Sequence, residues 1–164
     1  MKEYLSFIYE SRYINRQQHH YSCGPTAVMN ALKWLGVKVK YRCDINNFLD
    51  YEYKHSEGMY NTGVKKAFKD YGYDIKRKVY VTIPLLKEEL LKGNAIVLNY
   101  NHRIGGHYLF IKSYNANENR FEVHNDSRLD ASMGDPNKLS EDFKRAKKRN
   151  DPPEMWIIPK KYKI

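Results

Sequence analysis

Two hydrophobic periodicities divide the chain into a first part that predicts helices and a second part that predicts strands. Three segments carry an apolar residue every three or four positions, the spacing of one buried helix face, over residues 23–35, 62–71 and 83–92. From Ala95 the pattern becomes alternating or continuously apolar, which is typical of strands. These strands cover residues 95–100, 107–114, 120–125 and 155–158. Helices followed by antiparallel strands predict an α+β fold.

Capping residues and glycines mark the ends of the three helices. Ser22 and Thr82 precede the first and third helices, where a side-chain oxygen accepts a hydrogen bond from a free backbone N–H. Gly36, Gly72 and Gly93 follow the three apolar patterns, as expected for residues that end helices. The boundaries are therefore defined at both ends by local chemistry.

The remaining segments carry weaker signals. We expect strands over residues 4–9 and 73–81, helices that begin near Asp44 and Ser140, and loops over residues 54–59 and 126–136. No linker, repeat or low-complexity stretch separates these elements. A chain of 164 residues can bury one sizeable core, so we expect a single domain over residues 1–164.

Composition adds a strong positive charge to this picture. The formal net charge is +10, and basic residues gather over residues 65–66, 76–78, 144–149 and 160–163. Such a charge favours acidic partners, nucleic acid or anionic membrane surfaces. We favour a solvated basic surface over a dedicated nucleic-acid site. No stretch is long and apolar enough to span a membrane, and the N-terminus lacks the apolar core of a signal peptide, so we expect a cytoplasmic protein.

The two cysteines differ in their surroundings. Cys23 stands at the predicted start of the first helix, where the helix dipole and free N–H groups favour a thiolate. This position makes Cys23 a candidate nucleophile, although a buried structural thiol is the simpler interpretation. Cys43 has no such companions and is expected in the core. We expect no disulfide in a cytoplasmic protein, and the spacing is not that of a zinc site.

A histidine and a carboxylate supply the other two parts of a thiol-based catalytic site. His107 follows Gly105-Gly106 at the start of a strand, and Asp126 follows the next strand after a polar turn. A hairpin would place these two ends side by side, so Cys23, His107 and Asp126 can act as nucleophile, base and orienting group. His124 is the alternative base, and Asn125 is the alternative orienting residue.

A glutamine six residues before Cys23 completes a family resemblance. With Gln17, Cys23-Gly24-Pro25, Gly106-His107 and Asp126, the chain resembles the papain-like cysteine peptidases over about residues 13–126. Within them it resembles the peptidases that process bacteriocins at double-glycine leaders, although Ser127 stands where members often have proline. The resemblance implies a papain-like fold, in which an N-terminal helical half carrying the cysteine packs on a C-terminal antiparallel sheet. It also implies an oxyanion hole formed by the Gln17 side chain and the Cys23 N–H, with Gln18 as the alternative.

The functional hypothesis is therefore a cysteine peptidase that acts on a protein or peptide substrate, with acidic character favoured by the charge. The resemblance implies no metal and no organic cofactor. Two alternatives stay open at this point. The same triad could serve a thiol acyltransferase or a small-molecule amidase, and the basic surface could belong to a non-catalytic binding protein.

Overall fold

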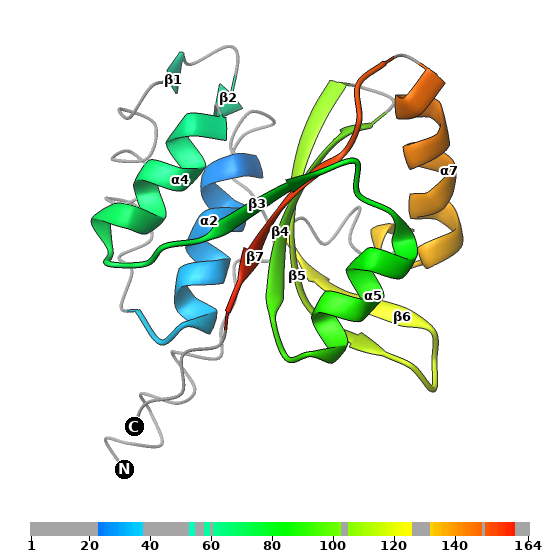
Figure 1. Ribbon diagram of the computed structural model, residues 1–164, viewed down its shortest axis with the longest axis horizontal. Helices are drawn as coiled ribbons and strands as arrows, with labels where there is room; N and C mark the ends of the chain where they lie inside the picture. Colours follow the sequence, from blue (N-terminus) through cyan, green and yellow to red (C-terminus); the bar gives the residue numbers. More distant parts are fainter. Residues whose placement is uncertain are drawn as a thin grey trace.

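A five-stranded antiparallel sheet lies between two pairs of helices in this computed structural model (Figure 1). The structure describes residues 23–37, 53–54, 58–59, 61–102, 105–125, 132–148 and 150–159. One face of the sheet carries α2 (Cys23–Trp34) and α4 (Asn61–Asp70), and the other carries α5 (Ile83–Leu91) and α7 (Pro136–Lys148). The prediction of an α+β fold, with N-terminal helices packed on a C-terminal antiparallel sheet, is confirmed.

The strands run in the order β3-β7-β4-β5-β6. Their bounds are Lys76–Val79 for β3, Ala95–His102 for β4, Gly105–Asn115 for β5, Arg120–His124 for β6 and Glu154–Ile158 for β7. β4 pairs with β5 on one side and with β7 on the other, so it is the central strand that its apolar run predicts. Because helices cover both faces, Ala95, Ile96, Val97, Leu98 and Tyr100 of β4 are all buried, and the apolar run is nearly continuous.

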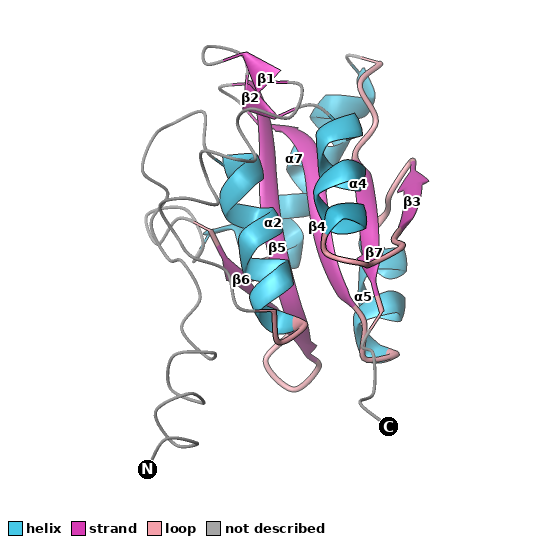
Figure 2. Cartoon of the chain, turned by 90° about the vertical axis from the view of Figure 1, so that its left-hand side faces the viewer, coloured by secondary structure: helices cyan, strands magenta, loops and turns pink. Residues whose placement is uncertain are grey.

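Alternation along the strands creates two separate cores. Ala95 and Val97 point toward α2 and α4, whereas Ile96 and Leu98 point toward α5 and α7. Figure 2 shows α2 and α4 lying across the first of these faces. The two cores stabilise opposite sides of the same sheet, and only the first contains Cys23.

The first helix ends where its glycine predicts. Gly36 adopts a positive φ of 83°, a conformation that glycine reaches without the steric cost of a side chain. Its N–H donates to the Lys33 carbonyl at 2.9 Å, and the Val37 N–H donates to the Leu32 carbonyl at 3.0 Å. These two bonds satisfy carbonyls that the helix end leaves unpaired. The predicted stops at Gly72 and Gly93 are confirmed by the same pattern.

The predicted cap of α5 is also confirmed, and it supports a stability prediction. Thr82 is extended, and its hydroxyl accepts a hydrogen bond from the Leu85 N–H at 3.3 Å. Replacing Thr82 by alanine should lower the free energy of unfolding by about 1 kcal/mol, because that N–H loses its acceptor. Urea titration followed by circular dichroism measures the change. Thr82→Ser keeps the acceptor and should stay near wild type; a serine variant as unstable as the alanine variant would argue against the cap.

Two predictions from the sequence are wrong: the start of the last helix and the loop at residues 54–59. The last helix begins at Pro136 rather than Ser140, because proline suits a first helical turn and the Asp135 carboxylate accepts from the Asn137 N–H at 3.0 Å. The expected loop at residues 54–59 includes a short antiparallel pair, β1 (Tyr53–Lys54) with β2 (Gly58–Met59). The predicted strand over residues 4–9 and the predicted helix beginning near Asp44 lie outside the described residues.

One basic cluster forms an edge of the sheet. Lys76, Arg77 and Lys78 lie on β3, which pairs only with β7 and is largely exposed. Charged side chains on an edge strand oppose pairing with another chain. This cluster therefore has a structural explanation that requires no nucleic acid.

The described helices are short. The longest helix that the structure describes, α7, has 13 residues, while a bilayer requires about 20 apolar ones. In the ranges that the structure describes, no helix is fit to cross a membrane.

Candidate active site

Cys23 is the first residue of α2 and lies at the junction between this helix and the sheet. Its side chain is 8% exposed and belongs to the core that α2 shares with β4, β5 and β7. The thiol accepts a hydrogen bond from the backbone N–H of Tyr108, the fourth residue of β5. The fold thus brings the start of α2 onto the start of β5, two segments that are distant in the sequence.

Burial and hydrogen bonding act on the thiol in opposite directions. Burial raises the pKa of Cys23, and the backbone N–H groups of Tyr108, Gly24 and Cys23 itself lower it less strongly. The pKa of the thiol is therefore raised, contrary to the expectation that the helix N-terminus alone favours a thiolate. A thiolate at neutral pH then requires a cation beside it.

His107 lies on β5 immediately before the residue whose N–H contacts the thiol. Its side chain is 9% exposed, and its ring packs edge-on against Tyr100 with centroids 6.2 Å apart. The Tyr100 ring packs against Phe143 on α7, and its hydroxyl donates a hydrogen bond to Met133 Sδ. The backbone of His107 is therefore placed next to Cys23, while the contact shown for its ring is on the α7 side.

The end of β6 lies close to His107 along the paired strands. The β5–β6 register ends with Phe110 opposite His124, so the predicted hairpin is confirmed. Asn125 follows with a fully buried side chain. The alternative base, His124, is less buried, and its Nε2 lies 3.0 Å from Glu122 Oε1. Asn125, the alternative orienting residue, thus lies buried at this end of the sheet.

A buried asparagine on the cysteine helix ties that helix to β6. Asn30 is fully buried, and its side-chain amide donates to the His124 carbonyl at 2.9 Å across 94 residues of chain. This bond satisfies a buried polar group on a helix that also buries Thr26, and it sets α2 against the sheet. Sequence reasoning did not identify Asn30, although a polar residue within the apolar pattern of a helix is a visible signal.

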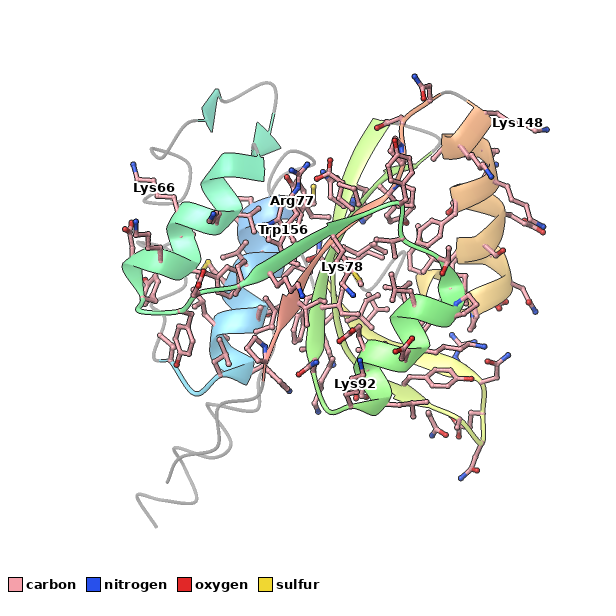
Figure 3. The ribbon with its side chains drawn as sticks, viewed as in Figure 1. Lys66, Arg77, Lys78, Lys92, Lys148 and Trp156 are labelled. Carbon is pink, nitrogen blue, oxygen red and sulfur yellow. The ribbon has the colours of Figure 1, made fainter. Side chains whose placement is uncertain are left out.

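Tyr108 was also missed, and its side chain is part of the same neighbourhood. Its ring stacks on Trp156 with centroids 6.2 Å apart, and burial raises the pKa of its hydroxyl, with further increases from the charges of Cys23 and Glu154. The nearby Arg77 acts in the opposite direction and pairs with Glu154 at 2.8 Å. Figure 3 shows Arg77 and Trp156 on the side of the sheet that carries α2. Tyr108 follows His107 directly along the strand, so its side chain points to the opposite face of the sheet. This position was the sequence signal that could have identified Tyr108.

Three predicted site residues lie outside the described residues: Gln17, its alternative Gln18, and Asp126. The described part brings together Cys23, the His107–Tyr108 segment and the end of β6. Among the described side chains, no three His, Cys, Asp or Glu residues gather as metal ligands would. The described residues therefore place the Cys23 thiol next to the backbone of the strand that carries His107, while the His107 ring contacts Tyr100.

Comparisons with known proteins agree with this geometry. The model of the Peptidase_C39 like family matches residues 8–150. The peptidase domain of Streptococcus ComA, a bi-functional ABC transporter involved in a quorum-sensing pathway, shares the fold with a TM-score of 0.61 and 15% identity, over 90% of this chain and 99% of that one. A C39-like peptidase from Bacillus anthracis gives a TM-score of 0.58 and 12% identity, over 93% and 97% of the two chains. No curated protein matches the sequence.

Proposed function

The chain belongs to the Peptidase_C39 like family, and from this premise we propose that it is a cysteine peptidase with Cys23 as nucleophile and His107 as base. Membership supports cysteine peptidase activity in general terms. The assignment of roles rests on this chain's own residues. The observation that carries it is the thiol of Cys23 at a helix start, in hydrogen-bond contact with the strand residue that follows His107.

In the proposed reaction, His107 takes the proton of the Cys23 thiol, and the thiolate attacks the carbonyl carbon of the scissile amide. The negative charge on the carbonyl oxygen is stabilised by the Cys23 N–H and the Gln17 side-chain amide. His107 then protonates the leaving amine. Water, activated by His107, hydrolyses the thioester and releases the acid.

An orienting residue would hold the His107 ring in the correct tautomer. We assign this role to Asp126, with Asn125 as the alternative, since both follow β6. The buried position of Asn125 and the bond from Asn30 to the adjacent His124 carbonyl support a rigid environment at this end of the sheet. Asp126→Ala and Asn125→Ala variants separate the two assignments.

The proposal is tested by the pH dependence of Cys23 alkylation. Burial raises the pKa of the thiol, so a cation beside it is needed to bring the reactive thiolate into the neutral range. Iodoacetamide should therefore label Cys23 in the wild type with an inflection below the free-thiol pKa of about 8.5. In His107→Ala the cation is gone and burial remains, so the inflection should move above about 8.5.

Mass spectrometry locates the label, with Cys23→Ser as the blank and Cys43 as an internal reference thiol. His124→Ala is the matched control, because it removes the other histidine near the end of β6. Its profile should follow the wild type. Equal profiles for the wild type and His107→Ala would show that His107 does not activate the thiol.

A further inference from the structure

A concave site lies on the side of the sheet opposite Cys23. It is a pocket of about 520 Å³ between residues 80–84, α7 and residues 150–153. Its buried walls, Val81 and Phe143, belong to the core on the α5 and α7 face, whereas Cys23 belongs to the other core. Neither Cys23 nor His107 lines this pocket, although Phe143 in its wall packs against Tyr100, which contacts the His107 ring.

The wall segments are held together by backbone hydrogen bonds. The Val81 N–H donates to the Pro153 carbonyl at 3.2 Å, which joins the segment before α5 to the segment before β7. After α7, the Asp151 N–H donates to the Ala146 carbonyl at 3.0 Å and ends the helix. The pocket is thus formed by three tied segments, and its volume falls in the range of small-molecule sites, about 300–1,000 Å³.

The chemistry of the lining is apolar with a positive rim. Apolar side chains dominate: Tyr80, Val81, Ile83, Pro84, Phe143, Pro152 and Pro153. Lys144 and Lys147 line the pocket from one face of α7, against a single acidic lining residue, Asp151. In the described part of the chain neither lysine forms an ion pair, whereas Arg145 on the same helix is paired with Asp142. Two cations at the edge of an apolar pocket are thus available to an anionic ligand.

Tyr80 adds an aromatic ring at the mouth of the pocket. Its side chain is 73% exposed, and its backbone has a positive φ of 58°, where glycine would carry no steric cost. An exposed tyrosine at such a position contributes little to the core. Its ring is placed to contact a ligand that enters the pocket.

We propose that this pocket binds a small apolar carboxylate, a compound with one ring or short chain and one carboxylate group. The apolar part would lie against Val81, Phe143 and Pro153. The carboxylate would lie at Lys144 and Lys147, with the Tyr80 ring over the mouth. The combination of mostly apolar walls with a few convergent charges is that of a site for small amphipathic molecules.

The test uses the full chain, isothermal titration calorimetry and three probes. 4-Phenylbutyrate carries both features, 4-phenylbutanamide lacks the charge, and acetate lacks the apolar part. We expect saturable binding of 4-phenylbutyrate, binding of the amide weaker by about tenfold, and no measurable binding of acetate, because a hydrogen bond to a charged group is worth about that factor. Equal affinities for 4-phenylbutyrate and 4-phenylbutanamide would overturn the proposed role of the lysines.

Charge-matched variants locate the site. Lys144→Gln with Lys147→Gln should weaken 4-phenylbutyrate binding about tenfold. Lys138→Gln with Lys148→Gln removes the same charge from exposed positions of α7 that do not line the pocket, and should leave binding unchanged. Figure 3 shows Lys148 at the outer end of this helix. An equal loss in both double variants would indicate non-specific attraction, and no loss in the first would place the ligand elsewhere; either result overturns the proposal.

Tyr80→Gly tests the aromatic ring at an exposed position whose backbone suits glycine. Removing the side chain relieves the left-handed backbone, so the melting temperature should rise while 4-phenylbutyrate binds severalfold more weakly. Unchanged binding would exclude contact with the ring. An acidic peptide that displaced the probe with higher affinity would show a peptide-docking surface instead. None of these readouts depends on turnover at Cys23.

Discussion

Replacing Cys23 by alanine should lower kcat/KM for peptide hydrolysis by roughly 10⁴-fold or more, because no other group in the proposed reaction can form the thioester. His107→Ala should cause a loss of similar order. Since the two residues act as one unit, the double variant should be little worse than either single variant. A peptide library screened with the wild type supplies the substrate, and mass spectrometry of the products separates hydrolysis from acyl transfer to another amine or thiol.

The controls for this experiment address folding and the choice of base. Cys23 is buried but small, so Cys23→Ala should keep the circular dichroism spectrum and melt cooperatively. His124→Ala should retain activity, because its ring is associated with Glu122 rather than with the thiol. Activity lost in His124→Ala and kept in His107→Ala would reverse the assignment of the base. Activity kept in Cys23→Ala would exclude the thiol mechanism altogether.

Replacing Trp156 by alanine should produce the largest loss of stability, about 3–5 kcal/mol in the free energy of unfolding. The side chain is 1% exposed, lies in the core between the sheet and α2, and stacks on Tyr108. Its removal takes away buried apolar area and leaves a cavity beneath the residue whose N–H contacts the thiol. A domain of this size has only about 5–15 kcal/mol of stability, so the variant should be marginal.

Urea titration followed by circular dichroism measures this loss, with two comparison variants. Trp156→Phe retains most of the apolar volume and should lower the free energy of unfolding much less. Val79→Ala on the adjacent edge strand removes a side chain that is 44% exposed and should change stability by less than about 0.5 kcal/mol. A Trp156→Ala variant as stable as Val79→Ala would mean that the core between α2 and the sheet is not packed as described.

The sequence alone predicted the elements that local chemistry governs. The glycines after α2, α4 and α5 end those helices because only the residue's own backbone freedom and a few neighbouring carbonyls are involved. The alternation after Ala95 predicted four of the five strands of the sheet closely. The start of α7 was missed because two competing local signals, Pro136 after Asp135 and Ser140, both resemble helix starts.

The candidate site also has features that the sequence indicated and features that it did not. Cys23 at a helix start and His107 at a strand start could be recognised from the sequence, because each depends on its own element and on a short motif. Their surroundings could not be recognised. The hydrogen bond from the Tyr108 N–H and the bond from Asn30 to His124 join residues that are distant along the chain, and the contact of His107 with Tyr100 depends on the register in which β4 pairs with β5.

What the sequence determined by itself is therefore the α+β order and the C-terminal ends of α2, α4 and α5. What only the tertiary structure decided is the environment of those groups. The helix start favours a thiolate, but burial against the sheet outweighs it and raises the pKa of Cys23. The pocket beside α7 likewise exists only because residues 80–84 meet α7 and the residues that follow it, which lie far along the chain. Burial and long-range packing depend on which faces of the helices and strands come together, and a local sequence pattern does not indicate this.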